Sequence, residues 1–248
     1  MSTPESKVVI EVAIAASPDK VWEALRDPIE IARWFGWDAD SLADEIKYIF
    51  LDHAKEDGRR TLRFEGMPDR FELVEGGGGT LLRLVRDGAA GDDSDWDGPN
   101  EDMTEGWKAF MEQMRFALER HPGATRRTFR LSGDLERVGT LPRARLGWEA
   151  LPAVGGAYAA SIGPDAPSGQ VWHRSRRQLA VTAEAYGDGL LLITDTCVNE
   201  ERPHGGGSIT VTTYGLDGAA FDAVHERWRV WWRENFPGAM KDELSARS

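Results

Sequence analysis

Hydrophobic and polar positions along the chain follow two periods, one of two residues and one of three to four. The stretch SPDKVWEALRDPIEIARWFG, residues 17–36, has the longer period and predicts two short helices. Ser17 and Asp27 suit N-cap positions, and each precedes a proline, which is favourable in the first helical turn. Gly36 suits the C-terminal end of the second helix. This stretch therefore predicts a pair of helices joined at a kink.

Most of the remaining first half has the shorter period, which indicates antiparallel strands. A β-branched stretch at residues 8–15 precedes the helical pair and is expected to form the first strand. Further strands are expected at residues 46–51, 60–65, 70–75 and 80–86. Alternation is clearest in the last three, and turn sequences rich in glycine separate the strands. We therefore expect a meander with one buried face.

A long amphipathic helix is predicted to follow, from about residue 103 to residue 120. Its apolar residues recur at spacings of three and four: Trp107, Phe110, Met111, Met114 and Leu118. The sequence His121-Pro122-Gly123 is expected to end this helix.

The second half of the sequence repeats this plan without a clear helical pair. A strand is expected at residues 127–135 and a short helix at 142–150. Five strands are expected to follow, at residues 157–162, 170–173, 178–186, 190–198 and 208–214. The last helix is expected at residues 218–235, with an apolar side formed by Phe221, Val224, Trp228, Trp231 and Trp232.

The repeated plan predicts two domains in tandem. The first is expected to span residues 1–123 and the second, a diverged copy, residues 126–241. Residues 242–248 are expected to form a polar tail. A single large mixed domain is the alternative interpretation.

Composition limits the classes of partner. The chain has 248 residues and a formal net charge of −12, which argues against broad binding to nucleic acid or to an anionic membrane. The single cysteine, Cys197, rules out an internal disulfide framework, fits a reducing cytoplasm and lies in an apolar run that favours a buried thiol. The polar residues 1–7 lack the apolar core of a signal peptide, and no apolar run approaches the ~20 residues of a membrane span. We therefore expect a cytoplasmic protein.

The first half resembles the START-like (SRPBCC, helix-grip) superfamily, and within it the branch named after the activator of Hsp90 ATPase. The residues that carry the resemblance are Ala16-Ser17-Pro18, Val21 to Leu25, Asp27-Pro28, Arg33 to Gly36 and Gly106-Trp107. The resemblance covers about residues 7–121, and this meander looks one strand shorter than the usual sheet of the family. It implies an α+β fold of the helix-grip (Bet v 1/START-like) type, in which an antiparallel sheet wraps around a long C-terminal helix. The tandem then implies two such copies.

The helix-grip fold implies a tunnel between sheet and helix that favours apolar ligands. By pattern, its lining in the first domain consists of Trp34 and Phe35 from the helical pair, Phe50, Phe64 and Phe71 from strands, and Trp107 and Met111 from the long helix. The alternative interpretation for each of these side chains is ordinary core packing, because aromatic residues and methionine fill cores as readily as they line sites.

Three functions are compatible with the sequence, and binding of a small apolar or amphipathic ligand is the one we favour. The family resemblance also suggests a chaperone partner, and the superfamily includes cyclases and hydrolases. Neither a catalytic signature nor a cofactor motif occurs, so an enzyme is not predicted and no cofactor is expected. The tryptophan-rich last helix could bury an interface between the domains or within a homodimer.

Two sets of polar residues could still carry chemistry. His53 and His173 fall in expected strands and could act as a general acid or base, although a structural histidine is the simpler interpretation. Arg174, Arg176 and Arg177 form a basic cluster that could bind a carboxylate or the acidic patch of a partner. The alternative for this cluster is a solvated strand edge.

An acidic loop precedes the long helix of the first half. Asp93, Asp95 and Asp97, followed by Gly98, match the start of a calcium-binding loop. The twelfth position, where such a loop closes with glutamate, is Thr104 instead. A solvated acidic linker is the alternative.

Calcium binding by this loop has a direct test. If Asp93, Asp95 and Asp97 hold calcium, millimolar calcium should raise the melting temperature, because a ligand that binds only the folded state stabilises it. A thermal-shift titration measures this, and no rise at millimolar calcium would rule the site out.

Overall fold

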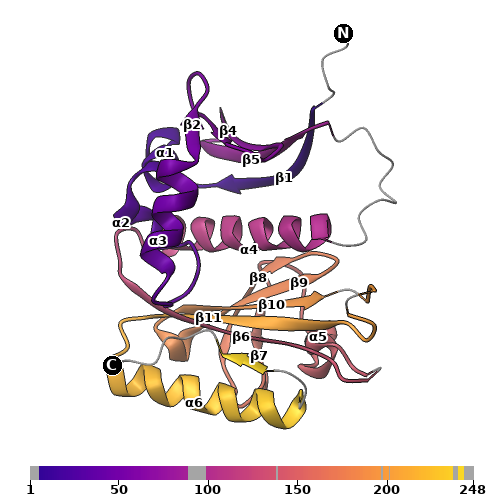
Figure 1. Ribbon diagram of the computed structural model, residues 1–248. Helices are drawn as coiled ribbons and strands as arrows, with labels where there is room; N and C mark the ends of the chain where they lie inside the picture. The colour runs from indigo at the N-terminus through magenta and orange to yellow at the C-terminus, as the bar shows by residue number, and fades with distance from the viewer. Residues whose placement is uncertain are drawn as a thin grey trace. The chain divides into compact units, whose positions relative to one another are not determined.

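The computed structural model describes residues 6–88, 99–137, 139–196, 198–200, 202–236 and 240–242, without the side chains of 99–101 and 240. The chain forms two compact units, which are described separately. The first unit comprises Met1–Gly36 and Asp40–Ala124, and the second comprises Trp37–Ala39 and Thr125–Ser248. In each unit an antiparallel sheet packs against a long helix that follows the long strands of the sheet in sequence (Figure 1). The predicted α+β helix-grip fold is therefore confirmed.

The sheet of the first unit has the strand order β1-β5-β4-β3-β2, so the first strand pairs with the last and the others follow in reverse. The strands are β1 (Ser6–Ile14), β2 (Ala54–Glu56), β3 (Thr61–Phe64), β4 (Asp69–Gly76) and β5 (Gly79–Asp87). The helices are α1 (Pro18–Arg26), α2 (Pro28–Ile31), α3 (Leu42–Ile46) and α4 (Pro99–Arg120), with a π-helix at Lys47–Asp52. The core lies between the sheet and α4 and includes Leu62, Leu82 and Leu84.

The capping residues act as the sequence predicts. The hydroxyl of Ser17 accepts a hydrogen bond from the backbone N–H of Lys20, and the carboxylate of Asp27 accepts one from the N–H of Ile29 at 2.8 Å. The second helix of the pair is shorter than expected, because α2 ends at Ile31 and turns continue to Gly36, whose φ is +65°.

The expected strand at residues 46–51 is wrong. This segment is the end of α3 followed by the π-helix, and β2 is a separate strand further along the chain. The burial pattern gives the reason: Ile46 and Phe50, four residues apart, are buried, whereas Tyr48 and Leu51 are exposed. In a strand Tyr48 would share the face of Ile46 and Phe50 and would be buried with them, so its exposure fits a helical period instead.

The sheet of the second unit has the order β12-β6-β11-β10-β9-β8-β7 and repeats the winding of the first. Here β6 pairs with β11, and β10, β9 and β8 follow in reverse order, as β4, β3 and β2 do in the first unit. The strands are β6 (Arg126–Asp134), β7 (Ala157–Ala159), β8 (Ser168–Arg174), β9 (Gln178–Ala183), β10 (Gly189–Thr196), β11 (Gly206–Tyr214) and β12 (Met240–Asp242). The last helix, α6 (Gly218–Asn235), has the predicted bounds.

Three details of the second unit differ from the sequence expectation. The expected helix at residues 142–150 is two pieces, α5 (Pro142–Arg145) and a 3₁₀ turn at Trp148–Ala150, because Gly147 between them has a φ of +69°. The expected strand at residues 178–186 ends at Ala183, and a 3₁₀ turn follows. Asp242, expected in a polar tail, lies in β12, which pairs with β6. Cys197 lies outside the described residues.

Trp37–Ala39 follow the helical pair in sequence but belong to the second unit. The carboxylate of Asp38 accepts hydrogen bonds from Arg127 Nε at 2.7 Å and from the backbone N–H of Thr128 at 3.2 Å. The guanidinium of Arg130 lies over the ring of Trp37, 4.8 Å from its centroid. The chain therefore passes between the two units three times.

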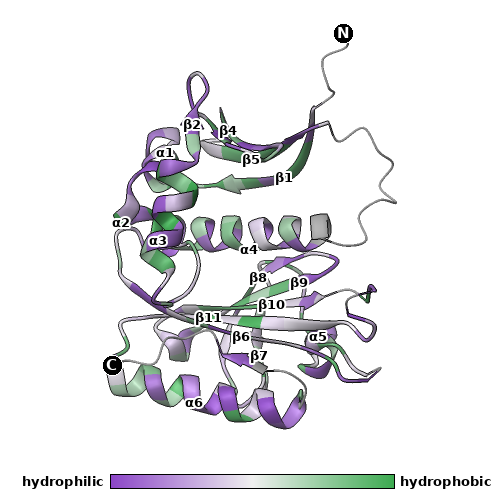
Figure 2. Cartoon of the chain, viewed as in Figure 1, coloured by the Kyte–Doolittle hydropathy of each residue, from purple (hydrophilic) through white to green (hydrophobic). Residues whose placement is uncertain are grey.

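Hydrophobic faces of α4 and α6 alternate with polar ones (Figure 2). In the second unit, α6 contributes Phe221, Val224, Trp228 and Trp232 to the core, whereas Trp231 is only partly buried. A polar chain supports Trp228: its indole N–H donates to the hydroxyl of Tyr186 at 2.9 Å, and that hydroxyl donates to Asp165. Burial, followed by the bond to Asp165, raises the pKa of Tyr186 above its ordinary value.

At Gly163 the backbone lies close to the ring of Trp228 on α6. The φ of Gly163 is +64°, and a Cβ added there would lie 2.4 Å from the ring of Trp228. Any other residue would therefore combine left-handed backbone strain with a steric clash.

We predict that Gly163→Ala lowers the free energy of unfolding by about 2–4 kcal/mol, as the sum of backbone strain and overpacking. The matched control is Gly155→Ala, where φ is +85° and nothing lies within 4 Å of the added Cβ. That variant should lose only the strain, about 1–2 kcal/mol. Urea unfolding measures both, and equal losses would show that the contact with Trp228 is unimportant.

Candidate functional site

The side chains predicted to line a tunnel in the first unit come together in one place. All of them are buried and belong to the hydrophobic core: Trp34, Phe35, Phe50, Phe64, Phe71, Trp107 and Met111. They come from the helical pair, the π-helix, β3, β4 and α4. Phe50 belongs to the π-helix and not, as predicted, to a strand. We call this group the aromatic cluster.

Trp107 lies at the centre of the aromatic cluster. Its ring stacks on Phe64, with centroids 5.3 Å apart and an interplanar angle of 28°, and Phe71 meets it edge-on at 5.2 Å. Phe50 also meets Trp107 edge-on at 6.2 Å, and Phe35 lies 5.0 Å from Phe50. Offset and edge-to-face geometries of this kind are the favourable ones for aromatic pairs. The rings therefore contact one another across the space between the sheet and α4.

Trp34 has a positioning role at one side of the aromatic cluster. Its indole N–H donates to the backbone carbonyl of Ala24 in α1 at 2.8 Å, which fixes the ring orientation. The ring then meets Phe35 and Phe50 edge-on, at 5.7 and 5.6 Å. The hydrogen bond ties the residues after α2 to α1 and holds the buried ring of Trp34 in place.

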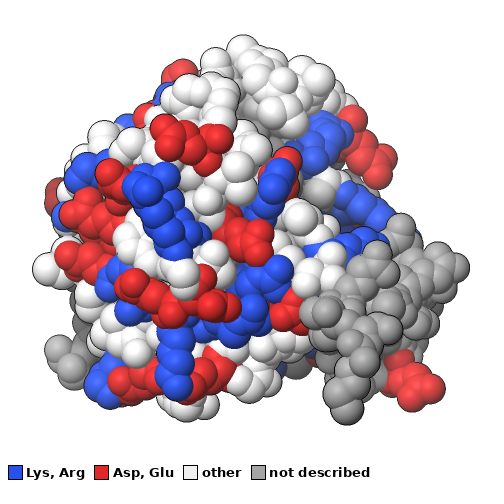
Figure 3. All heavy atoms as spheres, turned by 90° about the horizontal axis from the view of Figure 1, so that it is seen from above, with Lys and Arg blue, Asp and Glu red and all other residues white. Residues whose placement is uncertain are grey.

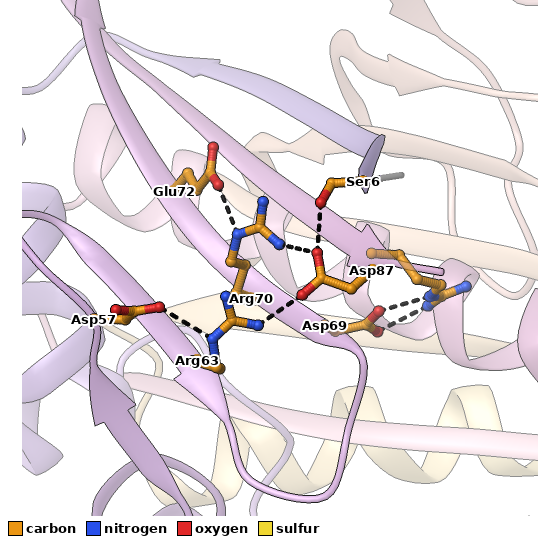
Figure 4. Close-up of polar contacts among 8 residues, drawn as sticks. Ser6, Asp57, Arg63, Asp69, Arg70, Glu72 and Asp87 are labelled. Atoms are coloured by element: carbon orange, nitrogen blue, oxygen red, sulfur yellow. Dashed lines mark hydrogen bonds and ion pairs between the residues drawn. The ribbon is translucent and has the colours of Figure 1, made fainter. Parts of the chain in front are cut away.

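A buried ion pair faces the same interior as the aromatic cluster. Arg86 Nε lies 2.6 Å from Asp69 Oδ1 and Arg86 Nη2 lies 2.8 Å from Asp69 Oδ2, so the contact is bidentate (Figure 4). Arg86 Nη1 also donates to the hydroxyl of Thr104 on α4 at 3.2 Å. Asp69 is fully buried, and it precedes Phe71 by two residues, so both side chains lie on one face of β4.

Sequence reasoning missed Asp69 and Arg86, although a signal was present. Along each strand, the residues two positions away point to the same face of the sheet and are apolar. Asp69 and Arg86 are also direct cross-strand partners. Charged residues at inward positions are uncommon, because removing an ion from water costs several kcal/mol unless it is paired with good geometry. Their phase in the pattern could therefore have indicated a buried pair.

A second set of charges lies on the outer face of the same sheet. Asp87 accepts hydrogen bonds from the hydroxyl of Ser6 at 2.6 Å, from Arg63 at 2.8 Å and from Arg70 (Figure 4). These bonds, that from Ser6 above all, lower the pKa of Asp87 from 3.8 to about 2. Asp57 contacts the same Arg63 at 3.2 Å. Acidic and basic side chains are interspersed on the face drawn in Figure 3.

The histidines do not join the aromatic cluster. His53 follows the π-helix, and its ring lies 4.1 Å from that of the exposed Tyr48. His173 is a residue of β8 in the second unit. Within the described part of the chain, no three metal-ligating side chains gather in one place. Asp93, Asp95 and Asp97 lie outside the described residues.

The second unit contains a hollow of about 270 Å³. Its lining combines α5, the 3₁₀ turn after α5 and the turn between β8 and β9: Arg143, Trp148, Glu149, Arg174, Ser175, Arg176 and Leu179. Two residues of the predicted basic cluster, Arg174 and Arg176, line this hollow, and Arg177 is not part of the lining. We call it the arginine hollow.

Comparisons with known proteins give no family. No protein-family model matches the chain, and no curated protein matches it. Among solved structures, the chain is similar to DynU16, from the dynemicin biosynthetic locus, at 18% identity over 94% of this chain and 96% of that chain, with a TM-score of 0.31.

Two further crystal structures are similar, both of di-domain ARO/CYC proteins. One is BexL from the BE-7585A biosynthetic pathway, at 12% identity over 98% of this chain and 100% of that chain, with a TM-score of 0.34. The other is StfQ from the steffimycin biosynthetic pathway, at 10% identity over 89% and 92%, with a TM-score of 0.29. With TM-scores below 0.5, these likenesses carry no inference about what this chain does. Among the described residues, no helix has the length and apolarity that crossing a membrane requires.

The lowered pKa of Asp87 predicts an acid-sensitive contribution to stability. Because the carboxyl has a lower pKa in the folded state, the unfolded state takes up the proton first as the pH falls. The contribution is therefore complete above about pH 4 and is lost as the pH falls towards about 2. Asp87→Asn should lower stability near neutral pH and flatten the pH dependence in this window.

Asp57→Asn is the matched control, because Asp57 contacts Arg63 through a single longer bond. It should change the acid limb much less than Asp87→Asn does. Chemical unfolding at a series of pH values measures both, and an Asp87→Asn curve parallel to that of the unsubstituted protein would contradict the assignment.

Proposed function

We propose that the first unit binds a small apolar or amphipathic molecule between α4 and the inner face of β3, β4 and β5. The observation that carries the proposal is the ion pair of Asp69 and Arg86, which shares this face with the aromatic cluster. Ligand sites in proteins have this composition: mostly apolar and aromatic walls with a few polar groups at fixed positions.

The ion pair supports binding more than it supports folding. Replacing a buried ion pair by apolar residues of similar volume is often neutral or stabilising, so stability alone does not call for charges at these positions. Arg86 Nη1 also donates to the hydroxyl of Thr104 at 3.2 Å, so the ion pair extends to α4. A ligand with an apolar body and a polar end could place the body against Trp107 and the end near Arg86 and Thr104.

Ligand entry needs a rearrangement of the aromatic cluster. The rings contact one another in the free protein, so a ligand must separate at least one pair of them. The measured affinity then includes the cost of reaching the open arrangement. Trp107 and Phe64 are candidates for the moving pair, because Trp107 is the most exposed member of the cluster and stacks on Phe64.

Two alternatives have less support from the interior. Asp69 and Arg86 are bonded to each other, and this contact gives no specific support to cyclase- or hydrolase-type catalysis. A place in the branch named after the activator of Hsp90 ATPase, and with it a chaperone partner, rests on the resemblance of residues 16–36 and 106–107 alone. Stimulation of the ATP turnover of a chaperone by the purified protein would favour that function.

The proposal predicts saturable binding of a small neutral aromatic probe, 1-aminoanthracene, measured by its fluorescence with the full chain. Met111→Phe should weaken this binding by about 10-fold or more, because added volume on the inner side of α4 competes with the ligand. The matched control is Leu191→Phe, which overpacks the core of the second unit instead.

The control should change the probe affinity by no more than about twofold while losing comparable stability. Circular dichroism checks that both variants fold. If the unsubstituted protein does not bind the probe saturably, or if Met111→Phe binds it as tightly, the first unit does not hold its ligand here.

A further inference from the structure

The arginine hollow in the second unit has an unusual charge for this chain. Three arginines, Arg143, Arg174 and Arg176, line it, against one carboxylate, that of Glu149. The chain as a whole carries a net charge of −12. The excess of positive charge in one hollow of an acidic protein points to an anionic ligand.

Arg174 is held in place without being neutralised. Its Nη2 donates to three backbone carbonyls, those of Leu151 at 3.0 Å, Pro152 at 3.2 Å and Trp148 at 3.4 Å. Backbone carbonyls fix the guanidinium but carry no net charge. Arg174 therefore presents a full positive charge in a fixed position.

The other charged side chains differ in their partners. Arg143 is paired, with its Nε 2.8 Å from Asp195 Oδ2, and its Nη1 donates to the carbonyl of Ser175 at 3.2 Å. Arg176 is exposed and makes no ion pair or side-chain hydrogen bond with the residues that the structure describes. Within the same part of the chain, Glu149 forms no ion pair with any of the three arginines. Arg174 and Arg176 thus remain available to an anion.

The hollow also has an apolar part. Trp148 and Leu179 line it, and both are buried members of the core of the second unit. The buried indole N–H of Trp148 has no hydrogen-bond acceptor within the described structure. This N–H is buried, so it does not open into the hollow, and Trp148 contributes only apolar surface to the lining.

We propose that the arginine hollow binds a small aromatic or alkyl carboxylate. The carboxylate accepts from Arg174 and Arg176, in the charge-assisted geometry that guanidinium groups favour, and the apolar part lies against Trp148 and Leu179. The volume of about 270 Å³ is near the lower end of ligand pockets, which suits a small acid better than a long lipid. This site lies wholly in the second unit and does not depend on the function proposed for the first.

The test uses benzoate as the probe and isothermal titration calorimetry on the full chain. Benzoate should bind with one site per chain, and Arg176→Gln should weaken it by about 10-fold, the value of a charge-assisted hydrogen bond. Arg176 is exposed and has no described partner, so its loss should leave folding intact. The matched control is Arg145→Gln, which removes the same charge from α5 outside the lining and should change the affinity by no more than about twofold.

Two further ligands separate the parts of the proposal. Benzyl alcohol keeps the ring but lacks the charge, and inorganic phosphate keeps the charge but lacks the ring; both should bind at least about 10-fold more weakly than benzoate. Equal binding of benzyl alcohol would make the site merely apolar, and equal binding of phosphate would make it a general anion site. Either result would overturn the proposal, as would no benzoate binding up to ~10 mM or equal effects of Arg176→Gln and Arg145→Gln.

The variant Met111→Phe separates this site from the one in the first unit. It alters the interior of the first unit only, so benzoate should bind to it as to the unsubstituted protein. A loss of benzoate binding in Met111→Phe would place the carboxylate in the first unit and would contradict the assignment to the arginine hollow.

Discussion

Burial of one face of a curved antiparallel sheet against one long helix is the constraint on which each unit depends. In the first unit the contact of Trp107 with Phe64 and Phe71 holds α4 against the sheet. In the second, Phe221 of α6 meets Phe129 of β6 edge-on at 5.8 Å, and Trp228 and Trp232 belong to the same core. Both sheets pair their first strand with their last long strand, β1 with β5 and β6 with β11. The common winding gives both helices a sheet of the same kind to pack against.

The elements with a long, regular pattern could be predicted from the sequence. The bounds of α6 and the caps of α1 and α2 depend on local signals, namely apolar spacing, Ser17 and Asp27. The strand prediction for the segment around Ile46 and Phe50 was wrong. Its β-branched and aromatic composition suggested a strand, but the burial of its side chains follows a helical period. Strands β2 and β12 have three residues each, too few for alternation to be recognised. The place of Trp37–Ala39 depends on contacts of Asp38 with distant residues, which no local pattern encodes.

The candidate sites also differ in how far the sequence predicts them. The burial of Phe64, Phe71, Trp107 and Met111 could be predicted because they lie on the apolar sides of periodic elements, whereas Phe50 was assigned to the wrong kind of element. The ion pair of Asp69 and Arg86 could in principle have been predicted, because both residues lie at strand positions that point into the core. The arginine hollow could not, because it brings α5, a 3₁₀ turn and the turn after β8 to one place. The sequence marked Arg174 and Arg176 as a cluster but gave no sign that Trp148 and Arg143 lie beside them.

The central claim is that the interior of the first unit opens to admit a small molecule beside Arg86. A crystal structure of the protein grown with saturating 1-aminoanthracene tests it most directly. The claim predicts density for the probe between α4 and strands β3 to β5, with the ring of Trp107 or Phe64 moved from the stacked position. Rings packed as in the free protein, with the probe elsewhere or absent, would contradict it.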